Sequence, residues 1–260
     1  MKPVKKRVSL GKRLRSCPSF SCLGVMTNWE DYPVEARSAI KGAGKIFYSS
    51  RLYEDLFRSL GKEVFPRNYY RFMGDKIRQT ALFQLLDIPH PLTRLYYGRD
   101  RMDRISEDFS YPFVAKTPLG ASMGRGVWLV RSGDELRSYL QGHQPAYIQE
   151  YLPIDRDLRV VLLGGQVVHA YWRIAPAGEF RNNVSQGGAI SFADIPEEAL
   201  HFAVEVARIC RFDEVGLDIC RVNDSYYVLE ANMAYGLEGF RRVRLNIYDI
   251  FRQLDERNLL

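Results

Sequence analysis

The sequence predicts an α+β fold, and three observations lead to this expectation. The chain has 260 residues, enough for one large domain or two modest ones, and such a chain can bury a core without disulfide bonds. Hydrophobic residues make up 46% and charged residues 26%, values of an ordinary globular protein that exclude a disordered or coiled-coil chain. Between residues 71 and 260, strand and helix patterns mix irregularly, which favours antiparallel strands with helices over a doubly wound parallel sheet.

We expect two domains: residues 1–70 as a basic arm with a short α/β region, and residues 71–260 as the larger domain. A turn-rich patch at 65–68 marks the boundary between them. In the first part, Leu52, Leu56 and Leu60 recur every four residues, which is helical spacing. The elements expected there are helices over 34–43 and 51–60 and a strand over 45–49.

The larger domain is expected to begin with a helix over 75–86 that carries Ile77, Ala81 and Leu82, with Leu85 and Leu86, on one apolar face. Gly164 and Gly165 predict a two-residue hairpin turn with positive φ. Further strands are expected over 113–116, 127–130, 146–150, 157–163, 166–173, 214–221 and 226–230, and further helices over 134–140, 196–211 and 246–254.

The net positive charge gathers at the N-terminus. The chain carries 37 Lys and Arg against 31 Asp and Glu, and residues 1–29 hold seven of the basic and none of the acidic residues. The arm of residues 2–15 is therefore expected to be either a solvated tail or an electrostatic handle for an acidic partner. Because the rest of the chain is nearly neutral, the composition does not favour nucleic acid as a partner, although binding through the arm alone stays an alternative.

The sequence favours the cytoplasm as the compartment. Residues 16–21 are polar where a secretion signal would be apolar, and no run approaches the roughly 18 apolar residues of a membrane span. Four cysteines are too few for a disulfide scaffold, and Cys17 and Cys22 lack the second pair that a zinc site needs. The assembly state is open, a homo-oligomer included.

An acidic hairpin is the most informative segment. If residues 223–225 form its loop, Asp218 lies directly opposite Glu230 with Cβ atoms about 4.5–5.5 Å apart, and Asn232 lies on the same face. Two opposed carboxylates repel, so we expect a cation between them, and oxygen ligands favour Mg²⁺ over zinc. Mg²⁺ in turn suggests a phosphate-bearing partner. The alternatives are a shifted register or one acid in solvent. The expected core face holds Leu217, Ile219, Tyr227 and Leu229.

A glycine-rich loop follows Lys116 and precedes another strand. Gly120, Gly124 and Gly126 give it the freedom to close over an anion, or simply to form a mobile hairpin. It is neither a P-loop nor a dinucleotide fingerprint. Ser122 also completes a GxSxG pattern, but a strand follows it where a hydrolase elbow needs a helix.

Several donors and acceptors lie between this loop and the acidic hairpin. Asp157 and Arg159 are expected on one face of a strand, and Arg173 with Arg181 and Asn183 adds donors nearby. Such arginines are either solvated or bind phosphate, and their grouping here favours the second reading.

The motifs together resemble the ATP-grasp superfamily, and within it the RimK-type carboxylate–amine ligases. The similar stretch runs from about Asp75 to Phe240. Its motifs are DKIRQT, PFVAKTPLGASMGRGV, QEYLPIDRDLRV, FRNNVSQGG, VGLDI and VLEAN.

The resemblance implies an ATP-grasp fold in which two α+β lobes grip ATP, after a short N-terminal α/β region. It implies that Mg²⁺, or Mn²⁺ as an alternative, binds with ATP. The residues carried over are Lys76 and Lys116 for the phosphates; Gly120, Ser122, Gly124 and Gly126 for the closing loop; Glu150 and Tyr151 for adenine; Asp157 for ribose; Arg181, Asn182 and Asn183 for the nucleotide; and Asp218, Glu230 and Asn232 for the metal.

The resemblance also implies a reaction. Such ligases phosphorylate a carboxylate to an acylphosphate, which an amine attacks to give an amide, ADP and phosphate, so the expected partners are ATP, a carboxylate substrate and an amine acceptor. Arg173 and Arg159 are our candidates for stabilising the charged intermediate, and no side chain stands out as a general base. Residues 233–236 depart from the Ser-Pro-Gly usual in the family. The alternative is a catalytically silent ATP-binding regulator or scaffold.

Overall fold

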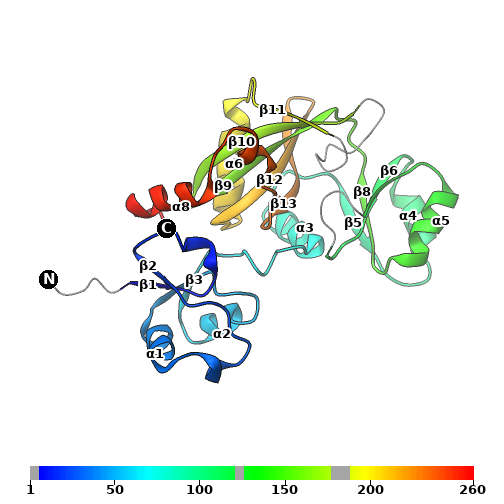
Figure 1. Cartoon of the computed structure of the whole chain (residues 1–260). Coiled ribbons are helices and arrows are strands. Elements are labelled where there is room, and N and C mark those ends of the chain that lie inside the picture. The colour runs from blue at the N-terminus through cyan, green and yellow to red at the C-terminus, as the bar shows by residue number, and fades with distance from the viewer. Residues whose placement is uncertain (1–5, 121–125, 177–187) are drawn as a thin grey trace.

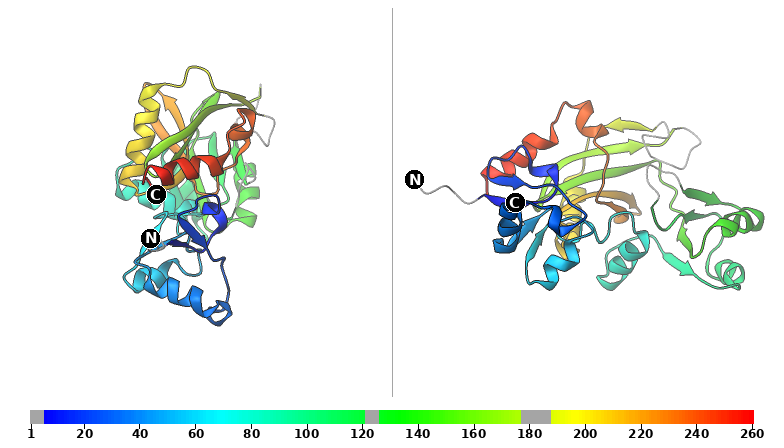
Figure 2. Two further views of the ribbon diagram at one scale, coloured as in Figure 1. Left: turned by 60° about the vertical axis from the view of Figure 1, so that its left-hand side comes forward. Right: turned by 60° about the horizontal axis from the view of Figure 1, so that its bottom comes forward.

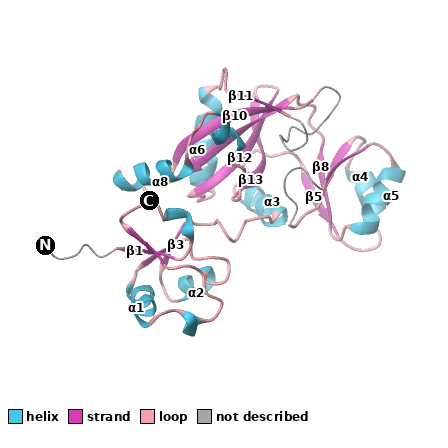
Figure 3. Ribbon diagram, viewed as in Figure 1, coloured by secondary structure: helices cyan, strands magenta, loops and turns pink. Residues whose placement is uncertain are grey.

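The structure is a computed structural model that describes residues 6–120, 126–176 and 188–260 (Figure 1). These residues form three sheets, each covered by helices (Figure 3). Within the described ranges, no helix is long and apolar enough to cross a membrane.

The N-terminal sheet is parallel, in the strand order β2-β1-β3-β4. Its apolar core contains Val8, Ile40, Ile46 and Phe57. The strands are β1 (Arg7–Ser9), β2 (Phe20–Cys22), β3 (Lys45–Phe47) and β4 (Glu63–Phe65), and the helices are η1 (Lys12–Leu14), η2 (Trp29–Asp31), α1 (Val34–Gly42) and α2 (Glu54–Ser59).

The basic arm is not a solvated tail over its described part, so that expectation was wrong. Residues 7–9 form β1 inside the sheet. Arg7 is ion-paired with Asp255, and Arg13 with the fully buried Glu214. These two arginines neutralise acids of the chain itself and are therefore not available as a free handle for an acidic partner.

The second sheet is antiparallel, in the order β5-β8-β6-β7, and forms a smaller lobe beside the third sheet, the larger lobe. Its strands are β5 (Thr93–Tyr96), β6 (Phe113–Lys116), β7 (Val127–Val130) and β8 (Ala146–Glu150), and its helices are α4 (Arg101–Asp108) and α5 (Gly133–Gly142). The sequence patterns predicted β6, β7 and β8 to the residue. They missed β5 and α4. Helix α4 buries only Ile105 and therefore lacks a clear apolar stripe.

The third sheet is antiparallel, in the order β11-β10-β9-β12-β13. Helices α6 and α3 pack on one face, and α7, α8 and residues of the N-terminal region pack on the other. The strands are β9 (Arg156–Leu163), β10 (Gln166–Ile174), β11 (Ala189–Ser191), β12 (Glu214–Val222) and β13 (Ser225–Asn232), and the helices are α3 (Lys76–Leu85), α6 (Glu197–Ile209), α7 (Glu238–Arg242) and α8 (Ile247–Glu256). Helix α8, in red, lies between this sheet and the N-terminal sheet (Figure 2).

Two hairpins position the strands that carry the site. Gly164 and Gly165 join β9 to β10 with φ of +58° and +76°, as the sequence predicts. The β12–β13 turn has two residues, Asn223 and Asp224, not the expected three, and pairs Val222 with Ser225. A β-bulge after Asp218 absorbs the difference, so Asp218 still lies opposite Glu230.

The bulge also changes which side chains of β13 reach the core. Val228 and Ala231 are buried, in place of the expected Tyr227 and Leu229, which are only half-buried. The extra residue shifts the alternation of the strand between its two ends, so the inward side chains there are not spaced by two.

Helix α3 faces the protein with its polar side. Lys76, Gln79, Thr80 and Phe83 are buried, whereas Leu85 is 80% exposed, so the expected apolar face was wrong. Leu52, Leu56 and Leu60 are exposed in the same way, at 51%, 55% and 71%. Polar bonds decide the orientation of α3: Gln79 accepts from the backbone N–H of Ala231, and Thr80 shares a hydrogen bond with Tyr147.

Candidate active site

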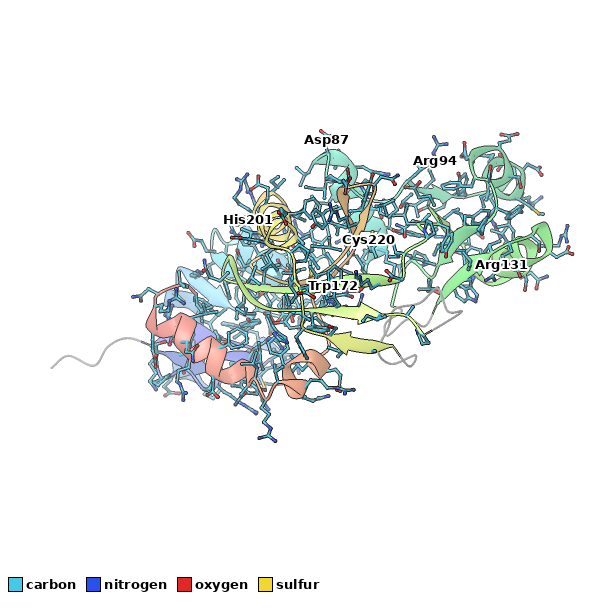
Figure 4. The ribbon with its side chains drawn as sticks, turned by 90° about the horizontal axis from the view of Figure 1, so that it is seen from above. Asp87, Arg94, Arg131, Trp172, His201 and Cys220 are labelled. Carbon is cyan, nitrogen blue, oxygen red and sulfur yellow. The ribbon has the colours of Figure 1, made fainter. Side chains whose placement is uncertain are left out.

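A pocket lies between the smaller lobe and the third sheet. Figure 4 shows the two lobes from above, with Arg94 and Arg131 on the smaller lobe and Trp172 and His201 on the larger one. Side chains from both lobes line the pocket: Val114, Lys116, Val127, Glu150, Tyr151, Asp157, Arg173, Asp218, Leu229 and Glu230 are among them. Seven of the site residues expected from the sequence therefore meet here.

Lys116 lines the pocket, and Lys76 contacts Glu230, which lines it too. Lys116 ends β6 and is buried, and this burial lowers the pKa of its ammonium to about 8, although Glu230 opposes the shift. Lys76 opens α3, directly after the N-cap residue Asp75, whose carboxylate accepts from the backbone N–H of Arg78. The Lys76 Nζ lies 2.7 Å from Glu230 Oε1, so the helix start presents a cation to the acidic hairpin.

The other carboxylate of the hairpin is held by arginines. Arg159 binds Asp218 through both Nε and Nη2, the latter at 3.0 Å from Oδ2. Arg173 Nη2 lies 2.9 Å from the same Oδ2, and Arg173 Nε donates to Asp157 Oδ1 at 2.6 Å. Asn232 Nδ2 also donates to Asp218 Oδ2, at 2.9 Å. A buried row of alternating charges thus crosses β9, β10 and β12.

These contacts set the protonation of the two aspartates. Burial opposes the ionisation of Asp218, but Arg159 and Arg173 outweigh it and hold the pKa of this carboxyl below its ordinary value. Asp157 is buried with Arg173 and close to Asp218, and here burial prevails, so its pKa is raised.

The opposed acids do not require a divalent ion to coexist, and this part of the sequence argument was wrong. Arginines balance Asp218, and Lys76 balances Glu230. Among the residues that the structure describes, no group of three His, Cys, Asp or Glu side chains could hold a metal ion. The donor set still fits Mg²⁺, because Asp218 and Glu230 carry carboxylate oxygens at paired positions of one hairpin and Asn232, two residues beyond Glu230, carries an amide oxygen. They remain the predicted ligands.

At the opposite end of the pocket, Glu150 and Tyr151 follow β8. The Glu150 carboxylate accepts from the backbone N–H of Leu92 at 2.7 Å, which fixes the segment before β5. Ile154 and Leu152 add apolar surface to the same end of the pocket.

The glycine loop is described only at its two ends. Gly120 and Gly126 have φ of +72° and +77°, and the Gly120 N–H donates to Gly74 O at 3.0 Å, tying the loop to the start of α3. Ser122 and Gly124 lie outside the described residues, and so do Arg181, Asn182 and Asn183. Of the two candidate catalytic arginines, Arg173 lines the pocket, whereas Arg159 lies behind Asp218.

Sequence reasoning missed the inner face of α3. Gln79 donates to Phe72 O and accepts from the N–H of Ala231. It thus ties α3 to β13 at the residue between Glu230 and Asn232. Thr80 shares a hydrogen bond with the hydroxyl of Tyr147 on β8. The signal for these residues was available, since Lys76, Gln79, Thr80 and Phe83 recur at helical spacing, but such a polar stripe is usually a solvated face.

The comparisons with known proteins agree with this geometry. Residues 73–253 match the RimK-like ATP-grasp domain. This chain belongs to the RimK-like ATP-grasp family. Its fold is accordingly the ATP-grasp fold. One relative, ribosomal protein bS6--L-glutamate ligase of Escherichia coli O139:H28, is 34% identical over 175 residues, which cover 65% of this chain and 58% of that protein.

Two further proteins show how far the likeness extends. Beta-citrylglutamate synthase B of Danio rerio is 34% identical over 162 residues, 59% of this chain and 40% of that protein. The chain thus spans about half the length of the curated relatives it matches. A solved structure of the ATP-grasp ligase PsnB, complexed with minimal precursor, Mg and ADP, aligns with a TM-score of 0.59 at 17% identity, over 94% of this chain and 87% of that chain. This last likeness concerns the fold.

Proposed function

We propose that this chain is an ATP- and Mg²⁺-dependent ligase that joins a carboxylate to an amine through an acylphosphate. One observation carries the proposal: Lys116 of β6 and Glu230 of β13 line one pocket between two lobes, and Lys76 of α3 is ion-paired with Glu230. Phosphates need such cations, and a nucleotide with a divalent ion needs such an acid. Membership of the RimK-like family supports this reading.

The residues of the chain would act mainly by positioning and by balancing charge. Lys76 and Lys116 would bind the phosphates, and residues 150–152 would border the adenine. Asp218, Glu230 and Asn232 would hold Mg²⁺, which supplies neutralisation of the phosphate oxygens when bound. Asp157 is proposed for the ribose, and the loop from Gly120 to Gly126 for closure over the phosphates.

Arg173 is the residue we propose for the charged intermediate, because its guanidinium lines the pocket beside Asp218. In the second half-reaction the amine nitrogen bonds to the acyl carbon, the bond from that carbon to the phosphate oxygen breaks, and phosphate leaves. The nitrogen loses its proton to solvent. Arg159 contacts Asp218 from behind, so we assign it the role of positioning that carboxylate.

We further propose that the amine substrate is an amino acid. L-glutamate is the first one to test, because the names of the E. coli and Danio rerio relatives both contain glutamate. Those names give different second substrates, so the carboxylate substrate is to be found with a panel of peptides and small carboxylic acids.

The test is the substitution Glu230→Gln, measured by ADP release with ATP, Mg²⁺, L-glutamate and the carboxylate panel. We expect turnover to fall on the order of 10²–10³-fold, because the substitution removes a proposed ligand of the Mg²⁺ that neutralises the phosphate oxygens in the transition state. Glu205→Gln is the control, because Glu205 is exposed and is ion-paired with Arg208 on the same helix, α6. Unchanged turnover in Glu230→Gln would overturn the site assignment. ATP binding without turnover on the whole panel would instead favour the silent regulator or scaffold.

A further inference from the structure

A second cavity, of about 680 Å³, lies outside the nucleotide pocket. It is bounded by α2 of the N-terminal region, by the chain before α3, and by the start of the glycine loop. The residues that matter for its chemistry are Arg51, Asp55, Arg71, Asp75, Arg78 and Gly120. Apart from Gly120 in the closing loop and Asp75 as the N-cap of α3, no role follows for these residues from the nucleotide site described above.

The cavity lies next to Lys76, whose side chain contacts Glu230 in the nucleotide pocket. Asp75 lines the cavity, and the next residue, Lys76, extends to Glu230. The Lys76 N–H donates to Pro118 O at 3.0 Å, and the Gly120 N–H donates to Gly74 O at 3.0 Å. The segments 74–76 and 118–120 are therefore held together where the cavity approaches Lys76. A ligand in the cavity would lie beside the reacting phosphate and away from the adenine end at Tyr151.

Arg51 is the group in this cavity that is best suited to a ligand. It is exposed, and its Nη2 donates to two backbone carbonyls, Met73 O at 2.7 Å and Tyr70 O at 3.5 Å. Among the described residues it forms no ion pair. A guanidinium has five N–H donors, so Arg51 keeps donors to spare, and a guanidinium in a cavity binds a carboxylate with two parallel bonds.

The neighbouring charges decide which class of ligand fits. Arg71 pairs with Asp55, whose side chain is 78% exposed, and Arg78 pairs with Asp75 at 3.4 Å. Exposed pairs of this kind contribute little to stability and can exchange partners. Glu54, also in the wall, is buried and paired with Arg58. The cavity contains positive and negative side chains, so Asp55 and Asp75 would repel a polyanion. An amino acid carries one positive and one negative group and therefore fits better.

We propose that this cavity binds the amine substrate as an amino acid, with its α-carboxylate on Arg51 and its amino group toward the segment 118–120. The proposal rests on the proposed function, because it gives that reaction its nucleophile. It directs the nitrogen toward the segment 118–120, which is hydrogen-bonded to the backbone of Lys76, the residue proposed for the phosphates.

The experiment measures binding of L-glutamate to the full chain by calorimetry, with ADP and Mg²⁺ present. Arg51→Ala should weaken this binding at least tenfold and leave the ADP affinity unchanged. Arg51→Lys keeps the charge but not the two-bond geometry, so its affinity for L-glutamate should lie between those of wild type and Arg51→Ala. Arg101→Ala is the matched control, because Arg101 also donates to backbone carbonyls, Gly98 O and Leu140 O, but lies on α4 of the smaller lobe.

A second ligand separates recognition from a merely structural role. γ-Aminobutyrate lacks the α-carboxylate, so wild-type protein should bind L-glutamate at least tenfold more tightly, and Arg51→Ala should lose this discrimination. Equal L-glutamate affinity in wild type and Arg51→Ala, or the absence of binding of any amino acid by wild type, would overturn the proposal. If ADP binds in those cases, only the cavity assignment fails; if ADP does not bind either, the proposed function fails as well.

Discussion

Asp218 and Glu230 lie directly opposite each other on β12 and β13, yet their carboxylates contact different cations. Asp218 binds Arg159 and Arg173 on neighbouring strands of the sheet, and Glu230 binds Lys76 from α3. The repulsion between the two acids is therefore balanced within the chain itself. A nucleotide with its metal ion would enter a site that is already close to neutral.

Removal of Arg173 should destabilise the fold strongly. Arg173→Ala would remove one cation from Asp157 and one of the two arginines from Asp218, in a region where all four side chains are buried. Breaking such a buried pair costs about 3–5 kcal/mol of unfolding free energy, which urea denaturation measures. Arg242→Ala, which removes an exposed i,i+4 pair with Glu238, should cost only about 0–1 kcal/mol. Equal losses in the two variants would contradict the buried row of charges.

The N-terminal arm should contribute to stability through Arg13 and not through its total charge. Glu214 is fully buried and also accepts hydrogen bonds from Tyr48 at 2.6 Å and Tyr235 at 2.9 Å. Arg13→Ala leaves this carboxylate without its cation, so we expect a loss of about 3–5 kcal/mol. Lys12→Ala removes the same charge from an exposed neighbour and should change stability by less than about 0.5 kcal/mol. If thermal unfolding shifts equally in both, the arm acts only through its charge.

Lys116 should make the stability of the nucleotide-free protein depend on pH. Burial lowers its pKa from 10.5 to about 8, so the unfolded chain binds more protons than the folded one between these two values. The free energy of unfolding therefore rises with pH across this window, because the cost of a buried ammonium disappears above pH 8. Urea denaturation at pH 7 and pH 10 should show this rise relative to Lys116→Met, which cannot titrate. An identical pH profile in the variant would show that Lys116 is not buried as a cation.

Gly216 lies where β12 of the acidic hairpin packs closely against Tyr235, in the segment after β13, and its missing side chain makes this contact possible. A Cβ at this position would lie 2.7 Å from Tyr235 Cβ and 3.2 Å from Arg159 Cδ, and the first of these atoms has no freedom to move away. Gly216→Ala should thus cost about 1–3 kcal/mol and also lower turnover, because it displaces the side chain that holds Asp218. Gly142→Ala, at the end of α5 with nothing within 4 Å, should be tolerated. Calorimetric unfolding and ADP release check both variants.

Local patterns predicted much of the site. The limits of β6, β7 and β8 followed from short apolar runs between turn residues, and the facing of Asp218 and Glu230 followed from strand pairing, although the turn is shorter than expected. The prediction held because a bulge after Asp218 compensated for the shorter turn, and the local sequence pattern does not predict that bulge. The buried face of α3 was predicted wrongly, since an exposed Leu85 and a buried Gln79 reverse the usual preference.

By itself, the sequence determined the mixed α+β class, the glycine loop after Lys116 and the hairpin that sets two acids face to face, because periodicity and turn chemistry act between residues close in the chain. Only the tertiary structure decided which cation each acid contacts and that the described part of the basic arm, from residue 6 on, belongs to the fold. The partners Arg13 and Glu214, Lys76 and Glu230, and Arg7 and Asp255 are each more than 150 residues apart. Such contacts form when whole sheets pack together, and no local pattern carries that information.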